Sequence, residues 1–556
     1  MEKLKRNKGT EGITLIALVV TVVVLLILAG VALNMVLGNN GIIKKAIDAK
    51  IQTEKTRLKE EADLIKTDLV IEENIGENTL TRYTLAEKIQ EQMGGTLKGP
   101  KVTTKDGKYD IYVKSDLEII VEKHIEETSS DEFEVLELAD GTLAVIKYNG
   151  TNPILNIPRE IEVNGEYKTV TQIGSEDADN IIGWEDAFLE QLTLPDTLKR
   201  IEDWALAMCF NKEVCAKITI PEGVVFLGEA TFYGNDLAEV IVPDSITEVG
   251  EMVFQDNKLK NINIPKGINK IPFAYASFNN ITEMDIPNNI TSIDDCAFLG
   301  NEITELDIPT SVTEIGERAF NSNKITKLNI PTSVKKMGVG AFSNNCLEES
   351  KAYIYNLDSN GIEDRTTLNS YAGNSTTTTI PTGIISIGEN AFMECENLVS
   401  LTLPNSVTTI GEDSFYNCKS LESINIPDSV TTIGESAFLG CTSLASINIP
   451  EGVTKVGQST FFGCTSLNSV SLPNGVTEIQ YSAFKSCPAL TSLTIPNSIT
   501  SIDVNAFGSK YDREDYTTAV INIDKAKDEI SGAPWGIRSP GKIVWNDGEE
   551  TAGAQY

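Results

Sequence analysis

The sequence contains a single histidine, His124, and this scarcity excludes most familiar catalytic arrangements. Serine and cysteine nucleophiles are commonly activated by a histidine base, and one histidine cannot build such sites along a long repetitive chain. The sequence also has no G-x-S-x-G, H-E-x-x-H, phosphate-loop or EF-hand motif. We therefore expect no enzyme activity and no cofactor. A hydrolase that uses paired carboxylates is a distant alternative, because acidic residues are plentiful.

Positive charge and paired cysteines are also scarce. The chain has 46 Lys and Arg against 80 Asp and Glu, a net charge of −34, and no basic patch. This charge balance argues against nucleic acid as a partner. The nine cysteines are odd in number and show no C-x-x-C spacing, so we expect neither a disulfide framework nor a zinc site.

A repeated unit fills most of the chain. Residues 404–472 read PNSVTTIGEDSFYNCKSLESINI, PDSVTTIGESAFLGCTSLASINI and PEGVTKVGQSTFFGCTSLNSVSL, one 23-residue unit written three times. A proline opens every unit, 22 residues apart in an earlier array and 23 apart in a later one. The prolines are Pro221, Pro243, Pro265, Pro287, Pro309 and Pro331, then Pro381, Pro404, Pro427, Pro450, Pro473 and Pro496. Such a period predicts a solenoid.

Each unit predicts one strand and one buried ring. Ile424 and Ile426 alternate with polar residues, as in a half-buried strand, and Pro427 ends that strand because it cannot donate a ladder hydrogen bond. A phenylalanine follows the proline by eleven residues in eleven of the twelve units, for example Phe438. Ala276 replaces it once, with Phe278 nearby, which indicates a local distortion. Stacked rings would form a continuous core.

The position fourteen residues after the proline distinguishes the two arrays. It is asparagine in the 22-residue units and cysteine in the 23-residue units. The residues are Asn235, Asn257, Asn279, Asn301, Asn323 and Asn345, then Cys395, Cys418, Cys441, Cys464 and Cys487. Five evenly spaced cysteines fit a metal or redox ladder or, alternatively, one small buried thiol per coil. The exchange with asparagine favours buried thiols.

This pattern resembles the BspA-like leucine-rich repeats, a family of surface proteins in bacteria and some protozoa. The resemblance covers about residues 133–545 and includes FEVLELADGTLAVIKYNG at 133–150 and APWG at 533–536. It implies a leucine-rich-repeat solenoid on a cell surface. It also implies that the Asn and Cys side chains satisfy buried backbone groups of the neighbouring turn.

The amino terminus predicts a membrane helix. Residues 13–37 are apolar apart from two Thr, one Asn and one Gly, and at ~1.5 Å per residue they are long enough to span a bilayer. Lys3, Lys5, Arg6 and Lys8 precede this run and favour a cytoplasmic amino terminus. Everything after residue 37 would then lie outside the cell membrane.

Three forms of this segment are possible. The basic leader ending in Gly12, followed by Ile13-Thr-Leu-Ile, resembles the type IV prepilin signal. That resemblance implies cleavage after Gly12 by a prepilin peptidase and methylation of Ile13, while Ala17 stands where the family usually has glutamate. The alternatives are an uncleaved signal anchor and a secretory signal cut after Ala32.

The remaining chain divides by its patterns. Apolar residues at three- and four-residue steps predict a helix over 42–72, and Thr84 with Glu87 predicts a capping box for a short helix ending at Gly94. Strands are expected at 109–113 and 117–121. The fold class is therefore mainly β with α: a transmembrane, pilin-like helix and a small α+β domain, followed by the solenoid.

The expected boundaries follow from these elements. They are a leader at 1–12, a transmembrane helix at 13–37, a pilin-like helix with a small sheet at 38–125, a polar linker at 126–132, an N-terminal cap at 133–194, the 22-residue array at 195–345, an insert or degenerate repeat at 346–380 with the composition of a surface loop, the 23-residue array at 381–510 and a C-terminal cap at 511–556.

The outward strand positions, two and four residues before each proline, are candidate binding residues. In the later array they are all small and uncharged: Ser400, Thr402, Ser423, Asn425, Ser446, Asn448, Ser469, Ser471, Ser492 and Thr494. In the earlier array they include charged residues such as Lys217, Glu305 and Asp307. A second polar ladder contains Thr408, Thr431, Thr454, Thr477 and Thr500. Either ladder could bind a ligand or be a solvated strand face.

Two classes of function fit these features. The first is a tethered cell-surface protein for adhesion, with a host or neighbouring-cell protein or glycan as partner. The second is a structural minor pilin or envelope spacer with no specific ligand.

The prepilin resemblance makes a testable prediction about the mature amino terminus. We expect a chain that begins at Ile13 with a methylated amino group, because cleavage after Gly12 removes the basic leader and leaves the apolar run. Mass spectrometry of the N-terminal peptide from the native host measures this directly. A start at Met1 would indicate the uncleaved anchor, and a start at Leu33 would indicate secretory cleavage; either one would contradict the prepilin assignment.

Overall fold

The computed structural model describes residues 42–72, 80–114, 116–175, 180–181, 189–210, 216–508 and 519–552, with short gaps at 527–528, 531–532, 534, 536, 538–540 and 549. The expected transmembrane segment at 13–37 lies outside these residues. Among the helices that are described, none combines the length and the apolarity that crossing a membrane requires. The chain forms two compact units, residues 1–126 and 127–556.

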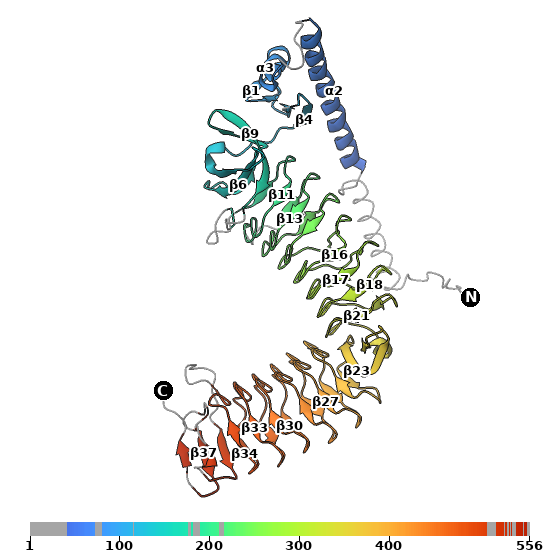
Figure 1. Cartoon of the computed structure of the whole chain (residues 1–556), viewed down its shortest axis with the longest axis vertical. Coiled ribbons are helices and arrows are strands. Elements are labelled where there is room, and N and C mark those ends of the chain that lie inside the picture. The colour runs from blue at the N-terminus through green and yellow to red at the C-terminus, as the bar shows by residue number, and fades with distance from the viewer. Residues whose placement is uncertain are drawn as a thin grey trace, which may run out of the picture. The chain divides into compact units, whose positions relative to one another are not determined.

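The first unit packs two helices on a small antiparallel sheet (Figure 1). Its elements are α2 (Ile42–Glu72), α3 (Arg82–Met93), β1 (Thr96–Lys98), β2 (Lys101–Thr103), β3 (Tyr109–Val113) and β4 (Ile119–Lys123), with the strands in the order β1-β2-β3-β4. Leu58, Ala62, Ile65 and Leu69 lie on the buried stripe of α2, and the core also contains Ile89. The hydrophobic spacing of 42–72 therefore forms the helix that it predicts.

Two local predictions in this unit were wrong. The residue that caps α3 is Thr81, whose hydroxyl accepts a hydrogen bond from the Thr84 backbone N–H at 3.2 Å, so the helix begins one turn before the predicted capping box. β4 begins at Ile119, because Leu117 has a φ of +64° and belongs to the turn. The strands β1 and β2 are too short for their alternation to be recognised in the sequence.

The second unit begins with a cap of mixed pairing. It contains η1 (Ser130–Glu132), β5 (Phe133–Glu137), β6 (Leu143–Tyr148), β7 (Ile154–Asn156), β8 (Glu160–Val163) and β9 (Glu166–Ile173). β5 pairs antiparallel with β6, and β8 pairs antiparallel with β9. In contrast, β6 pairs parallel with β9, and β9 pairs parallel with β11 (Arg200–Ile201) of the solenoid. This cap converts an antiparallel edge into the parallel ladder of the repeats.

The repeats form two rows of short parallel strands. One row precedes the prolines: β10 (Gln191–Thr193), β12 (Lys217–Thr219), β14 (Glu239–Ile241), β18 (Glu305–Asp307), β20 (Lys327–Asn329), β24 (Thr377–Thr379), β26 (Ser400–Thr402), β28 (Ser423–Asn425), β30 (Ser446–Asn448), β32 (Ser469–Ser471) and β34 (Ser492–Ile495). The other row follows them: β11 (Arg200–Ile201), β13 (Phe226–Leu227), β15 (Glu248–Val249), β16 (Lys270–Ile271), β17 (Ser292–Ile293), β19 (Glu314–Ile315), β21 (Lys336–Met337), β25 (Ser386–Ile387), β27 (Thr409–Ile410), β29 (Thr432–Ile433), β31 (Lys455–Val456), β33 (Glu478–Ile479) and β35 (Ser501–Ile502). Partners lie one repeat apart, as in Ser400 opposite Ser423.

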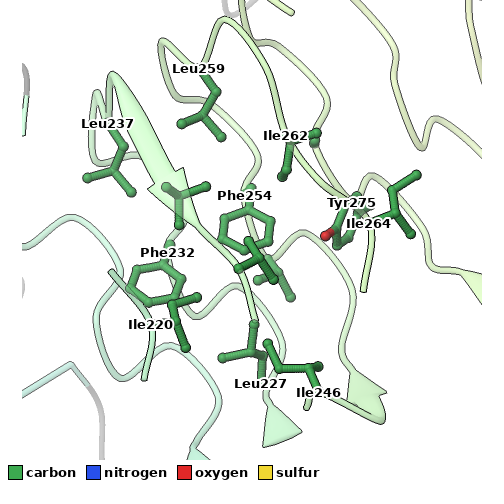
Figure 2. Packing of buried hydrophobic residues seen from close by; sticks show 14 of the residues in the cluster. Ile220, Leu227, Phe232, Leu237, Ile246, Phe254, Leu259, Ile262, Ile264 and Tyr275 are labelled. Carbon is green, nitrogen blue, oxygen red and sulfur yellow. The ribbon is translucent and has the colours of Figure 1, made fainter. Parts of the chain in front are cut away.

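Aromatic rings run through the core of both arrays. Consecutive rings stack nearly parallel, for instance Phe415 and Phe438 with centroids 5.2 Å apart. In the unit with Ala276, the ring comes from Tyr275, which is fully buried and meets Phe254 edge-on at 5.4 Å (Figure 2). Phe278, in contrast, is 49% exposed. The ladder is therefore maintained by the preceding residue in the chain.

The asparagine ladder satisfies buried backbone groups of the preceding coil. Asn257 donates from Nδ2 to the Phe232 carbonyl at 2.9 Å and accepts at Oδ1 from the Leu237 N–H at 2.9 Å. The same pair of bonds recurs through Asn345, which bonds the Phe320 carbonyl and the Ile325 N–H. The side chain thus forms hydrogen bonds with two main-chain groups that would otherwise be buried without partners.

A cysteine performs only half of that role, and the extra residue of the 23-residue unit supplies the other half. Cys441 Sγ donates to the Phe415 carbonyl at 3.2 Å, as Asn257 Nδ2 does to Phe232. In the 22-residue units the N–H of a following apolar residue, such as Leu237, bonds to the asparagine of the next coil. In the 23-residue units the equivalent N–H, of Leu444, donates to the Cys441 carbonyl of its own coil at 3.1 Å. One inserted residue therefore makes the asparagine oxygen unnecessary.

The cysteine thiols lie in the core. Cys395, Cys418, Cys441, Cys464 and Cys487 are all buried. Burial raises the pKa of Cys395 and of Cys487 to about 12, so these groups stay protonated at neutral pH. The interpretation of one buried thiol per coil agrees with this geometry.

Residues 346–380 are not the surface loop that their composition predicts. After η2 (Glu349–Lys351), β22 (Tyr353–Leu357) and β23 (Glu363–Tyr371) form an antiparallel hairpin, and β23 pairs parallel with β25 (Figure 1). The threonine run forms β24, paired with β26. The prediction was wrong because the polar residues of this segment cover one face of a sheet while Leu368 and Tyr371 are buried behind it.

The carboxyl end covers the last coil. β36 (Val520–Ile523), β37 (Lys542–Trp545) and β38 (Glu550–Ala552) continue the sheet of β34, and β38 pairs antiparallel with β37. Trp535 and Trp545 are buried with ring centroids 5.8 Å apart. These apolar groups shield the exposed end of the core, as a solenoid requires.

The burial of the thiols predicts a difference in chemical reactivity. Cys296 and Cys346 are only partly buried, whereas the five cysteines of the later array are shielded by the core. We expect a small thiol reagent to label Cys296 and Cys346 in the native protein, and Cys395 through Cys487 only after unfolding. Peptide mapping by mass spectrometry measures the order, and rapid native labelling of Cys441 would contradict the assignment.

The two ladder residues are also expected to differ in their effect on stability. Asn301→Ala strands the Ile281 N–H and the Ala276 carbonyl, so we expect a loss of about 3 kcal/mol. Cys441→Ala leaves the Phe415 carbonyl without its donor and creates a small cavity, so we expect a loss of about 1 kcal/mol in the free energy of unfolding. Urea unfolding followed by circular dichroism measures both variants. Equal losses would show that the amide has no special role.

Candidate recognition face of the later array

Ten small polar side chains form one outward face of the later array. This serine face consists of Ser400 and Thr402 on β26, Ser423 and Asn425 on β28, Ser446 and Asn448 on β30, Ser469 and Ser471 on β32, and Ser492 and Thr494 on β34. Nine of them are exposed and Ser400 is half-buried. The residue between each pair points into the core, so strand alternation fixes the outward direction.

The serine face has no internal hydrogen-bonding role. Within the part of the chain that the structure describes, none of the ten side chains has a polar partner. The parallel register places equivalent side chains in line, with Ser446 opposite Ser469 and Asn448 opposite Ser471. Because adjacent strands lie about 4.8 Å apart, the donors and acceptors form two regular lines.

The threonine ladder on the other side of each proline differs from this face. Thr431 Oγ1 donates to the Thr408 carbonyl at 3.4 Å, and Thr500 Oγ1 donates to the Thr477 carbonyl at 2.9 Å. Thr408 and Thr477 make the same bond to the preceding coil. These hydroxyls help to hold neighbouring coils together, which favours a structural role for the threonine ladder.

The corresponding face of the earlier array is charged, and its charges pair between coils. Lys217 contacts Glu239 at 2.5 Å, and Lys327 contacts Glu305 at 2.5 Å. A hollow of about 1070 Å³ lies over this face, lined by residues that include Glu283 and Asp285. The two arrays therefore present chemically different surfaces, as the sequence predicts.

A further strand, β24, extends the serine face beyond the sequence-based set. Thr377 and Thr379 point outward in register with Ser400 and Thr402. The inward Thr378 hydroxyl donates to the Glu349 carboxylate. These residues were missed because the threonine run has the composition of a loop, and only the pairing with β26 identifies it as a strand.

Glu349 anchors this added strand. Its carboxylate also accepts hydrogen bonds from Tyr353 at 2.5 Å, Tyr371 at 2.9 Å and Ser375 at 2.7 Å. Burial opposes ionisation, but these hydroxyl donors together hold the pKa of Glu349 below its ordinary value. No sequence pattern points to this residue, because its partners come from three separate segments.

His124 is packed against a carboxylate in the first unit. Its Nδ1 lies 2.9 Å from Asp110 Oδ1, and Thr103 donates to the same oxygen at 2.6 Å. Asp110 is almost fully buried, so the three side chains support the sheet. Across the described segments, no cluster of three His, Cys, Asp or Glu side chains is placed to hold a metal ion.

Comparison with known families identifies the repeats. A family model described as the BspA type leucine rich repeat region (6 copies) matches residues 184–275, 272–384, 366–462 and 441–524. The chain belongs to the BspA-type leucine-rich-repeat family. The matched ranges contain both arrays, so the 22-residue and 23-residue units are variants of the BspA-type repeat.

Solved structures with similar folds come from bacteria. A leucine rich cell surface protein from Faecalibacterium prausnitzii A2-165 is 27% identical, covers 66% of this chain and 94% of its own, and has a TM-score of 0.50. A leucine-rich repeat protein from Bacteroides ovatus is 22% identical over 75% of this chain and 98% of its own, with a TM-score of 0.36. Pneumococcal vaccine antigen PcpA is 18% identical over 81% and 100%, with a TM-score of 0.42. No curated protein matches the chain.

Proposed function

We propose that this BspA-type protein is a surface-displayed recognition protein that binds its ligand through the serine face. The observation that supports this most strongly is that ten aligned polar side chains lack internal partners, while the threonine ladder of the same coils is used internally. Hydroxyl and amide groups in such an array offer alternating donors and acceptors to a ligand. A solenoid face presents them over an extended surface.

The chemistry of the serine face favours a neutral polar ligand, either a glycan or an extended peptide of a neighbouring cell. Each neutral hydrogen bond contributes roughly 0.5–1.5 kcal/mol, so useful affinity requires several contacts along the array. The absence of charge in the ten side chains makes binding weakly dependent on salt.

The proposed location combines two observations. The related protein of Faecalibacterium prausnitzii is described as a leucine rich cell surface protein. The apolar residues 13–37 follow a basic leader and would tether the chain to the membrane with the repeats outside. A prepilin peptidase is the candidate processing partner, because Gly12 and Ile13 lie at the position where such leaders are cleaved.

A structural role without a ligand is the second candidate function. The regular, self-capped core would make the repeats a stable spacer or minor pilin component. Under this alternative the serine face would be only a solvated strand surface, and its substitution would change nothing that a binding assay measures.

Substitutions on the two faces distinguish these functions. We expect Asn425→Lys with Asn448→Lys to abolish binding to any ligand of the serine face, because long side chains block approach to β28 and β30. Stability should change by less than about 0.5 kcal/mol, since both sites are exposed. The measurement is binding of residues 38–556 to a glycan array and to immobilised surface proteins of neighbouring cells.

The matched control is Asp285→Lys with Asp307→Lys, at the equivalent positions of the earlier array. This variant should keep the binding profile of the unsubstituted chain. Equal loss in both variants, or loss in the control alone, would place the site on the earlier array. Specific binding that neither pair of substitutions alters would also contradict the proposal.

A further inference from the structure

One coil of the later array departs from the repeat at two adjacent positions. In four coils the strand that follows the proline is followed by glycine and then by an acidic or amide side chain. These glycines are Gly388, Gly411, Gly434 and Gly457. The coil of β33 has Gln480 and Tyr481 instead. Tyr481 is 47% exposed, and among the described residues its hydroxyl has no polar partner and its ring touches no other aromatic ring. Packing in the core therefore does not account for this side chain.

The coils spread apart just before Tyr481. A Cβ atom at Gly411 would lie 2.7 Å from the backbone nitrogen of Glu389, so the close contact between these two coils requires glycine. At Gly457 the nearest atom of the preceding coil would be Glu435 Cγ at 3.4 Å, an ordinary contact. Ladder pairing stops at the same place, because one sheet ends at β29 and the next begins at β31. The coils are therefore less tightly packed here than in the preceding repeats.

A hollow of about 370 Å³ lies at this place. It spans four consecutive coils and lies over the strands that follow the prolines, whereas the serine face is on the strands that precede them. The side chains that line this Tyr481 hollow include Glu435, Gln458, Glu478, Gln480, Tyr481 and Asp503. Sites for small ligands commonly have volumes of about 300–1,000 Å³, so the hollow has room for about one or two sugar rings.

Gln480 holds the polar groups of the hollow in place. Its Oε1 accepts a hydrogen bond from the Gln458 backbone N–H at 3.1 Å, and its Nε2 donates to Glu478 Oε1 at 3.1 Å. No described residue bonds to Glu478 Oε2, or to the side chains of Glu435 and Gln458. The hollow therefore offers carboxylate and amide groups that are free to bond a ligand, beside an exposed aromatic ring.

These groups match the two kinds of surface that a pyranose sugar presents. One face of the sugar ring carries C–H groups that pack on an aromatic side chain, which Tyr481 supplies. The rim carries hydroxyls that donate to acceptors such as Glu435, Glu478 and Gln458, and such hydrogen bonds are stronger when the acceptor is ionised. Lys455 lies opposite Glu478 in the strand register and partly balances the negative charge, which favours a neutral ligand over a cation.

We propose that the Tyr481 hollow binds a pyranose unit of a neutral glycan, with the sugar ring stacked on Tyr481 and its hydroxyls bonded to the side chains of Glu435, Gln458 and Glu478. The lining residues come from four consecutive coils, so the stacking of these coils shapes the site. The site lies outside the serine face and does not require that face to bind a ligand.

Saturation-transfer NMR on the full chain, held in zwitterionic detergent micelles that carry no sugar head group, tests this proposal. The probes are cellobiose, lactose and N,N′-diacetylchitobiose at millimolar concentration. We expect at least one probe to receive saturation, most strongly at the C–H protons of one ring face, because that face lies on the tyrosine. Tyr481→Ala should weaken binding of that probe by about tenfold, whereas Tyr481→Phe keeps the ring and should stay within about twofold of the unsubstituted chain.

A second variant removes the site by restoring the repeat. Gln480→Gly with Tyr481→Glu gives this coil the Ile-Gly-Glu sequence that residues 410–412 and 433–435 already have. We therefore expect it to fold, as circular dichroism would verify, and to lose the sugar. The matched control is Tyr416→Ala, which removes a tyrosine of the same array that does not line the hollow and should bind as the unsubstituted chain does.

The serine-face variant, Asn425→Lys with Asn448→Lys, should also keep this binding. Its loss there would place the sugar on the serine face and overturn the proposal. The absence of saturation in all three probes, or unchanged binding in Tyr481→Ala, would overturn it as well. Transfer to the polyamine spermidine alone, reversed by added salt, would show that the hollow selects a cation instead of a sugar.

Discussion

Buried main-chain groups must find hydrogen-bond partners in the neighbouring coil, and the structure depends on this constraint. A coil of 22 or 23 residues does not supply a donor for every buried carbonyl of its own. The carbonyl of each buried phenylalanine therefore accepts a hydrogen bond from the next coil. Asn257 donates to the Phe232 carbonyl at 2.9 Å, and Cys441 donates to the Phe415 carbonyl at 3.2 Å. The rings then stack because the same contact fixes the spacing of the coils. Removing it exposes a polar group to an apolar core, which costs more than the loss of one ring contact.

The sequence predicts what repeats and misses what occurs once. Prolines, phenylalanines and the Asn or Cys position recur, so their period alone predicts the strands, the core and the outward face. Tyr275 replaces a ring from a neighbouring position, which no fixed spacing anticipates. Thr81 and Thr84 both have a hydroxyl suited to capping, and only the backbone geometry at Thr81 distinguishes them. These failures involve choices between nearby residues of similar chemistry, which short patterns cannot resolve.

In the candidate face, too, the repeating residues were predictable from the sequence and the residues that occur once were not. Its ten residues were predictable because strand alternation and the proline position determine which side chains point outward. Thr377 and Thr379 were not, because their strand is recognisable only through its pairing with β26. Glu349 was also unpredictable, since its hydroxyl donors are assembled from the hairpin and β24. The polar character of the face was visible in the sequence, whereas its lack of internal partners required the structure.

The joint between the arrays has a cause in the repeat itself. In each 22-residue coil except the last, an apolar residue, such as Ile325, donates its N–H to the asparagine of the next coil. The equivalent residue of the last 22-residue coil is Leu347, and the next repeat along the chain has Cys395, which offers no amide oxygen. Its N–H bonds instead to the Ala372 carbonyl at 2.9 Å, just after β23. The hairpin thus supplies the acceptor that the change of repeat type removes. In this chain the insert therefore satisfies an N–H that the change from asparagine to cysteine would otherwise leave without an acceptor. The separation of the apolar core into two clusters at this hairpin coincides with the same mismatch.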